Sequence, residues 1–147
     1  SSDVCSSDLM EKQNIRAVTA EQLGELVDFI SIDVAFISLD KVLPVATTLL
    51  KNTGSLVALI KPQFEAGKEK VGKGGIVRER AVHEEVLSRI LQVAYDCKLY
   101  LHGLTFSPIK GTEGNIEFLG YFTKSEEGAL SITDELITAV VDEAHML

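Results

Sequence analysis

Residues 56–75 read LVALIKPQFEAGKEKVGKGG, and the rest of the chain can be interpreted outward from them. The segment opens with five consecutive apolar residues, bounded by Gly54 before them and Pro62 after them. A short apolar run without alternation is typical of a strand buried on both faces, as in a parallel sheet covered by helices. Lys61 follows the run directly. Because a charge at the end of a buried strand costs free energy unless a partner or ligand uses it, Lys61 is a candidate functional residue.

Alternating strands and helices are predicted along the chain. The predicted elements are, in order, a strand over 27–34, a helix begun by Ser38 and closed by KNTG at 51–54, a strand over 56–61, a helix over 80–97, strands over 99–106 and 116–123, and a helix over 132–145. Strand–helix alternation predicts a parallel sheet with right-handed crossovers. The connection SPIKGTEGN suits a wide hairpin, which makes one strand antiparallel. The predicted fold class is therefore α/β, mostly parallel, with one antiparallel strand in a C-terminal hairpin.

Composition narrows the functional classes. The chain has 147 residues, enough for one domain, and a net charge of −8. Residues 61–80 nevertheless carry six Lys and Arg against three Glu, a local charge of +3. The overall acidity argues against broad non-specific nucleic-acid binding, whereas the basic segment is compatible with a polyanionic substrate. Cys5 and Cys97 form no disulfide framework or metal motif, which predicts a reducing, cytoplasmic setting. No apolar run is long enough to span a membrane.

The N-terminal residues 1–9, SSDVCSSDL, lack the features of a signal peptide and are interpreted as a tag or a disordered leader. The predicted domain therefore covers residues 10–147. A doubly wound sheet usually carries a glycine-rich nucleotide-binding turn after its first strand, and no GxGxxG pattern precedes Val27. The sequence is therefore expected to be the second half of such a domain.

Three ionisable residues are placed at one predicted rim of the sheet. Asp33 ends the first complete strand, Lys61 ends the next, and Glu117 begins the antiparallel strand NIEFLGYF. A lysine between two carboxylates can serve as a general base or as an electrostatic stabiliser. The alternative is a buried ion-pair network without catalysis.

The segments DVAFISLDKVLP, LIKPQFEAGKEKVGKGGIVR and GLTFSPIKGTEGNIEFL closely resemble TlyA-type (hemolysin A-like) ribosomal RNA methyltransferases, which have an FtsJ-like domain. The resemblance implies a partial Rossmann-like class I fold that uses S-adenosylmethionine to methylate a ribose 2′-hydroxyl. It further implies that Asp33, Lys61 and Glu117 match the last three members of a Lys-Asp-Lys-Glu set. Lys61 would then take the hydroxyl proton, with Asp33 and Glu117 holding it.

The resemblance also assigns binding residues. The cofactor-binding candidates are Asn14, Ile15, Asp33 and Phe36, and the candidates for contact with substrate RNA are Ser38, Lys68, Lys70, Lys73 and Arg78. Each has an open alternative: a loop role for Asn14 and Ile15, core packing for Phe36, helix capping for Ser38, and a solvated loop for the basic residues.

The same resemblance implies family parts upstream of Met10, namely the first lysine of the catalytic set, the glycine-rich cofactor loop and a small RNA-binding domain. The chain alone is accordingly expected to be inactive, and its partner would be ribosomal RNA or a ribosomal subunit, not a membrane. Two other functions remain open. One is a non-enzymatic RNA-binding module that uses the loop 67–78. The other is the cytolysin that the hemolysin label suggests, which the acidic C-terminal helix disfavours.

Overall fold

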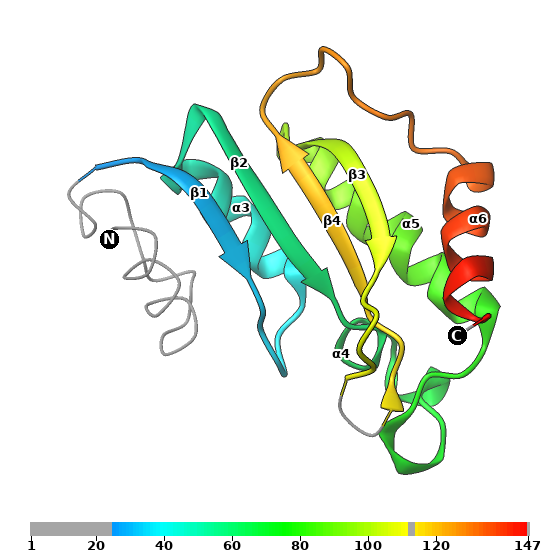
Figure 1. Ribbon diagram of the computed structural model, residues 1–147. Coiled ribbons are helices and arrows are strands. Elements are labelled where there is room, and N and C mark those ends of the chain that lie inside the picture. Colours follow the sequence, from blue (N-terminus) through cyan, green and yellow to red (C-terminus); the bar gives the residue numbers. More distant parts are fainter. Residues whose placement is uncertain (1–24, 112–113, 147) are drawn as a thin grey trace.

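The computed structural model of the chain describes residues 25–111 and 114–146. Figure 1 shows one twisted sheet with helices behind it and beside one of its edges. Its elements, in chain order, are β1 (Val27–Ile32), α3 (Leu39–Leu49), β2 (Leu50–Ile60), α4 (Pro62–Glu65), α5 (Arg80–Asp96), β3 (Tyr100–Phe106), β4 (Phe118–Thr123) and α6 (Asp134–Ala144). Two 3-10 turns, η2 (Lys68–Lys70) and η3 (Lys73–Gly75), lie between α4 and α5.

The sheet combines parallel and antiparallel pairing. Within the described residues its strand order is β1-β2-β4-β3. The strands β1 and β2 are parallel, and β4 is antiparallel to both of its neighbours, β2 and β3. The predicted α/β class, with a mostly parallel sheet and one antiparallel strand in a C-terminal hairpin, is confirmed. The hairpin strand β4 is inserted into the sheet between β2 and β3.

The core lies between the sheet and the helices α3 and α5, which cover the same face. Strand β2 points Leu56, Ala58 and Ile60 into this core, where all three are buried. Helix α6 packs against α5 and β3 at the edge of the sheet (Figure 1).

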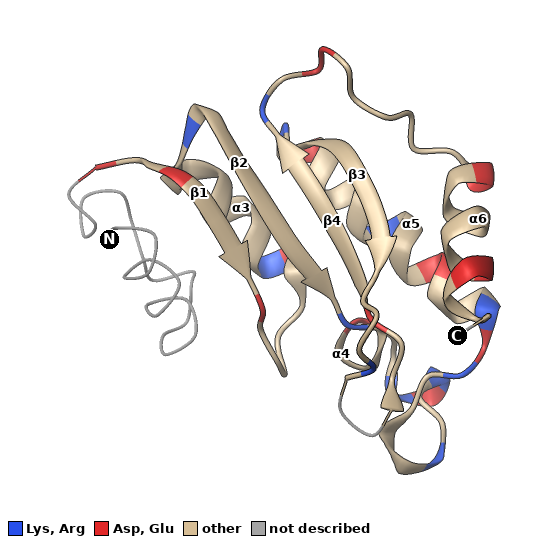
Figure 2. Cartoon of the chain, in the orientation of Figure 1, with Lys and Arg blue, Asp and Glu red and all other residues tan. Residues whose placement is uncertain are grey.

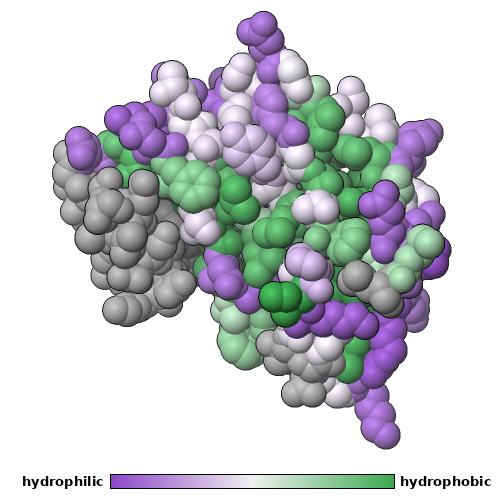
Figure 3. All heavy atoms as spheres, viewed as in Figure 1, coloured by the Kyte–Doolittle hydropathy of each residue, from purple (hydrophilic) through white to green (hydrophobic). Residues whose placement is uncertain are grey.

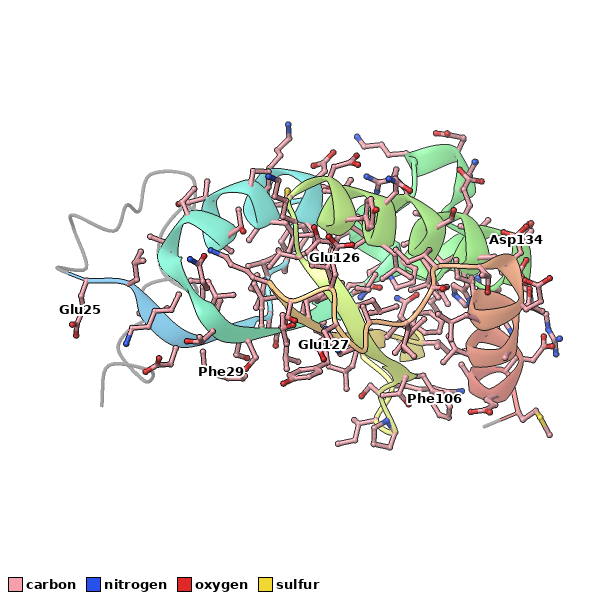
Figure 4. The ribbon with its side chains drawn as sticks, turned by 90° about the horizontal axis from the view of Figure 1, so that it is seen from above. Glu25, Phe29, Phe106, Glu126, Glu127 and Asp134 are labelled. Atoms are coloured by element: carbon pink, nitrogen blue, oxygen red, sulfur yellow. The ribbon has the colours of Figure 1, made fainter. Side chains whose placement is uncertain are left out.

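The opposite face of the sheet differs from the prediction. Val57 and Leu59, which alternate with the core residues of β2, are only partly buried, so the expectation of a strand buried on both faces is wrong. The described helices α3 and α5 lie on one side only, and Phe29 lies on the other side, away from them (Figure 4). Hydrophobic residues spread across the sheet face turned to the viewer in Figure 3.

The predicted end of the first helix is also wrong. Residues 51–54 belong to β2, and α3 ends at Leu49. The carbonyl groups at its C-terminal end accept hydrogen bonds from a residue far along the sequence. Nζ of Lys124 donates to the carbonyl oxygens of Thr47 and Leu50 at 2.6 Å each. Gly54 lies inside the strand, where a β-carbon would come within 2.8 Å of the Asp28 carbonyl oxygen. The glycine thus permits close strand approach and does not cap a helix.

Candidate active site

Asp33 and Lys61 meet at one rim of the sheet because they follow parallel neighbouring strands, β1 and β2. The distance from Lys61 Nζ to Asp33 Oδ1 is 2.5 Å. The Lys61 side chain is 16% exposed and that of Asp33 is 57% exposed. The pair therefore places a largely desolvated amine beside a carboxylate that faces solvent. Such a site is open to a ligand on one side.

Glu117 lies next to this pair. The last register pair between β2 and β4 is Ile60 with Phe118, so Lys61 and Glu117 follow as neighbouring cross-strand positions. Glu117 is 6% exposed, and its Oε2 accepts a hydrogen bond of 2.9 Å from Nε2 of Gln63. The structure thus brings the three predicted residues to one rim, with Glu117 bonded to Gln63 and Lys61 bonded to Asp33.

A third carboxylate, that of Glu65, holds the loop between β1 and α3 against α4. Glu65 accepts hydrogen bonds from the Ser38 hydroxyl at 2.6 Å and from the Leu39 backbone amide at 2.9 Å. Arg89 of α5 also donates to it, at 3.0 Å. Burial raises the pKa of Glu65, and these hydrogen bonds act in the opposite direction. The network fixes the start of α3 relative to the segment that carries Lys61.

Sequence reasoning did not identify Gln63, Glu65 or Arg89. The available signal was that Gln63 and Glu65 both lie in KPQFE, directly after the candidate residue Lys61. The partners of Glu65 at the start of α3 are 26 and 27 residues away along the chain. The capping role considered for Ser38 is confirmed, since its side chain accepts from the Asp40 amide at 3.2 Å. An RNA contact by Ser38 stays a prediction.

Phe36 has an unusual conformation for a bulky residue. Its φ is +64° and its side chain is 90% exposed, which excludes the alternative of core packing. The ring lies 4.7 Å from that of Phe64, centroid to centroid. The exposed Phe36 ring thereby packs against the half-buried Phe64 ring. A strained, exposed aromatic residue at such a rim suits contact with a ligand.

The basic segment after α4 is partly engaged within the chain. Lys70 forms an ion pair with Glu85 at 2.5 Å, and the Arg78 guanidinium donates to the Lys73 carbonyl at 3.1 Å. The side chains of Lys68, Lys73 and Arg78 are exposed. Figure 2 shows this run of Lys and Arg below the sheet, on the segment leading into α5, whereas most of the strand residues are uncharged.

Asn115 connects this segment to the turn before Glu117. Its Oδ1 accepts from the Val77 amide at 2.9 Å, and its Nδ2 donates to the Gly75 carbonyl at 3.0 Å. The Gly111 amide in turn donates to the Asn115 carbonyl at 2.8 Å. The basic segment and the Glu117 turn therefore form one connected unit.

Asn14 and Ile15 lie outside the described residues. Among residues 25–111 and 114–146, no group of three or more His, Cys, Asp and Glu is arranged to hold a metal ion. In the same part of the chain, no helix has both the length and the apolarity needed to cross a membrane.

Comparison with known proteins gives consistent matches. The FtsJ-like methyltransferase family matches residues 4–124. A Bacillus subtilis protein named as the rRNA methyltransferase YqxC is 46% identical, over 93% of this chain and 50% of the relative. The 16S/23S rRNA (cytidine-2′-O)-methyltransferase TlyA of Mycobacterium tuberculosis is 33% identical, over 84% of this chain and 46% of the relative.

A solved structure of a hemolysin from Streptococcus thermophilus superposes with a TM-score of 0.83 at 43% identity. The match covers 93% of this chain and 50% of the hemolysin chain. This chain thus spans about half the length of the relatives that it matches.

Proposed function

Because the chain belongs to the FtsJ-like methyltransferase family, we propose that it carries the catalytic part of an enzyme that methylates a ribose 2′-hydroxyl of ribosomal RNA. The observation that carries the proposal is the Asp33–Lys61 ion pair of 2.5 Å, with Glu117 at the neighbouring position. The names of the two rRNA methyltransferase relatives support the choice of substrate. This substrate also implies a cytoplasmic location.

Lys61 is the proposed base. A ribose hydroxyl is a weak acid, so its oxygen attacks more readily when a positioned amine takes the proton as the new bond forms. Lys61 must be neutral to accept that proton, and the adjacent Asp33 carboxylate then stabilises the ammonium that results. The hydroxyl oxygen gains the methyl group and its hydrogen moves to Nζ of Lys61. Asp33 and Glu117 hold the amine in position.

S-adenosylmethionine is the proposed methyl donor. When bound, it supplies a methyl group activated by the positive charge of its sulfonium. Two described features fit this cofactor, the exposed Phe36 ring and the solvent-facing Asp33 carboxylate. Asn14 and Ile15 remain proposed contacts to its adenine.

The test is methyl transfer to ribosomal RNA, using a chimera that supplies the half of the Bacillus subtilis relative that this chain does not span. Lys61→Ala should abolish transfer because the hydroxyl proton loses its acceptor. A matched control is Lys51→Ala, which removes a lysine at the other end of β2 that pairs with Asp28 of β1 at 3.2 Å. Undiminished transfer by Lys61→Ala, or no transfer by the unsubstituted chimera, would overturn the proposal.

A second candidate function is RNA binding without catalysis. It is supported by the exposed Lys68, Lys73 and Arg78 of the segment 67–78. RNA binding by this chain alone should then weaken steeply with salt and be reduced by the double substitution Lys68→Ala/Lys73→Ala. Lys70→Ala should have a smaller effect because Lys70 is paired with Glu85. The exposed pair Lys41→Ala/Lys98→Ala is the charge-matched control, and the absence of binding at low salt would exclude this function.

A further inference from the structure

Gln63 lies in α4, two residues after Lys61, and its side chain reaches the start of the neighbouring strand. Its Nε2 donates to Oε2 of Glu117 at 2.9 Å. Its other polar atom, Oε1, is buried without a hydrogen-bond partner. Within the described part of the chain, no other buried side-chain nitrogen or oxygen lacks a partner.

An unpaired buried carbonyl oxygen is unfavourable. Leaving such a group without a partner typically changes a folding equilibrium constant by about tenfold or more. A methionine of similar length would fill the same space without this penalty. Native proteins retain few such atoms, and each requires a reason. At this position the reason is the hydrogen bond that the amide nitrogen donates to Glu117.

The amide nitrogen of Gln63, and not its oxygen, faces the Glu117 carboxyl group. Exchanging the amide oxygen and nitrogen would place the oxygen 2.9 Å from a carboxylate oxygen, where two acceptors repel each other unless Glu117 is protonated. With Nε2 towards Glu117, the amide presents a donor to the carboxylate. Gly111 limits the other side, because a β-carbon there would overlap the Glu117 carboxylate. The carboxylate is held between a donor and a backbone that leaves no spare room.

We propose that Gln63 is a positioning residue that holds the Glu117 carboxyl group in one orientation beside Lys61. This inference rests on the proposed function, in which Glu117 acts by holding Lys61. Gln63 does not touch the reacting atoms, and it acts through Glu117. The unpaired oxygen is the cost of presenting the amide nitrogen to that carboxylate.

The first test uses this chain alone and measures the urea midpoint of unfolding. Gln63→Met should lower the midpoint, because it leaves a buried carboxylate without its donor. In a Glu117→Met background the same substitution should leave the midpoint unchanged or raise it, since Gln63 then has no partner for its amide nitrogen or its amide oxygen, and Met removes both unpaired groups. Gln92→Met is the control, because Gln92 is exposed and bonds to Asp96 on α5. Equal decreases in the two backgrounds would show that Gln63 does not act through Glu117.

The second test follows methyl transfer by the chimera as a function of pH. With Gln63→Glu, the introduced carboxyl group can donate to Glu117 only when it is protonated. The rate should fall at least tenfold near pH 8, with the KM for RNA unchanged, and should recover towards the unsubstituted rate as the pH is lowered. A loss of the same size at every pH would overturn the proposal, because a purely structural defect has no such profile.

The two tests separate this inference from the proposed function. If Lys61→Ala abolishes transfer while the unfolding measurements show no coupling between Gln63 and Glu117, the function stands and the positioning role is wrong. If Lys61→Ala retains full activity, the proposed function is wrong whatever the coupling. The unfolding measurements require no activity and can be made in either case.

Discussion

At the scale of single residues, close backbone approach shapes the site as much as charge does. The chain at Gly111 passes so near Glu117 that a β-carbon would overlap its carboxylate. A side chain at this position would force Glu117 to turn away from Gln63, since the Gly111 amide is hydrogen-bonded to the Asn115 carbonyl. Glycine is therefore required here for space.

We expect Gly111→Ala to lower the free energy of unfolding by about 1–3 kcal/mol and to reduce methyl transfer by the chimera at least tenfold. The displaced carboxylate would no longer be held beside Lys61. Gly103→Ala is the matched control, because a β-carbon there meets only Cβ of Tyr121 at an ordinary 3.5 Å. Urea unfolding and transfer rates measure the two effects. Equal losses of stability and activity in Gly111→Ala and Gly103→Ala would contradict the spatial requirement at Gly111.

His83 makes the stability dependent on pH. It is fully buried, its Nε2 donates to the Val77 carbonyl, and its Nδ1 lies 2.7 Å from Nε2 of His145. Since Nε2 carries the hydrogen, a neutral His83 accepts from His145 at Nδ1. Burial, with a smaller contribution from the charge of His145, lowers the pKa of His83 to about 4. Protonation would therefore place an uncompensated positive charge in a buried site.

Because the folded state binds the proton less readily than the unfolded chain, the stabilisation is complete above about pH 6.5 and is lost as the pH falls towards 4. We expect a loss of about 2 kcal/mol over that range. His83→Leu should flatten this dependence, whereas His102→Gln, which changes a histidine bonded to the Ser125 carbonyl, should not. Urea unfolding at pH 7 and pH 4.5 measures the difference, and parallel pH profiles for the three proteins would refute it.

At the scale of elements, helix α3 is fixed at both ends by side chains from other parts of the chain. Glu65 accepts from the first helical amide, at Leu39, and Lys124 donates to carbonyls of the last turn. A carboxylate at the N-terminus and an ammonium at the C-terminus both complement the helix dipole. The helix is thereby aligned with the two strands that it connects.

Removing the C-terminal partner should loosen α3. We expect Lys124→Met to lower the free energy of unfolding by about 1–2 kcal/mol, because buried carbonyl oxygens lose a charged donor. Lys98→Met is the control, since the exposed Lys98 lies near the same end of the helix. Thermal or urea unfolding gives the comparison. A loss no greater than that of the control would show that the cap is not stabilising.

The basic segment should be released by a change at Asn115. Asn115→Ala removes the partners of the Val77 amide and the Gly75 carbonyl. We expect amide hydrogen exchange over residues 72–77 to accelerate at least tenfold, with little change in β1. Asn52→Ala, at an exposed position in β2, is the control. Unchanged protection of Val77 would rule out the proposed anchoring.

At the scale of the whole molecule, the sequence predicted the order of elements and the rim where Asp33 and Lys61 meet. Both follow from local patterns, since apolar periodicity marks the strands and parallel neighbours end at one edge. Two of the failures came from long-range contacts. Gly54 was misread as a helix cap because the true cap, Lys124, is more than 70 residues away. Gln63 was missed because its partner Glu117 is 54 residues away.

The sheet face that the described helices leave uncovered predicts association between molecules. Phe29 and Tyr121 are exposed on it, next to the partly buried Val57 and Leu59. Exposed apolar patches favour contact between molecules. We expect Phe29→Lys/Tyr121→Lys to reduce concentration-dependent association in sedimentation velocity while changing the unfolding midpoint little. Tyr95→Lys, on α5, is the control. Unchanged association of the double variant would exclude this sheet face as the contact surface.

The insertion of β4 between β2 and β3 has a consequence for synthesis of the chain. The two halves of the sheet, β1-β2 and β3, cannot be joined until residues 118–123 have been made. Glu117 immediately precedes that strand, so it reaches Lys61 in the same late event. Pairing across such sequence separations is slow compared with local folding. The candidate active site therefore cannot assemble on a nascent chain before residues 117–123 have emerged from the ribosome.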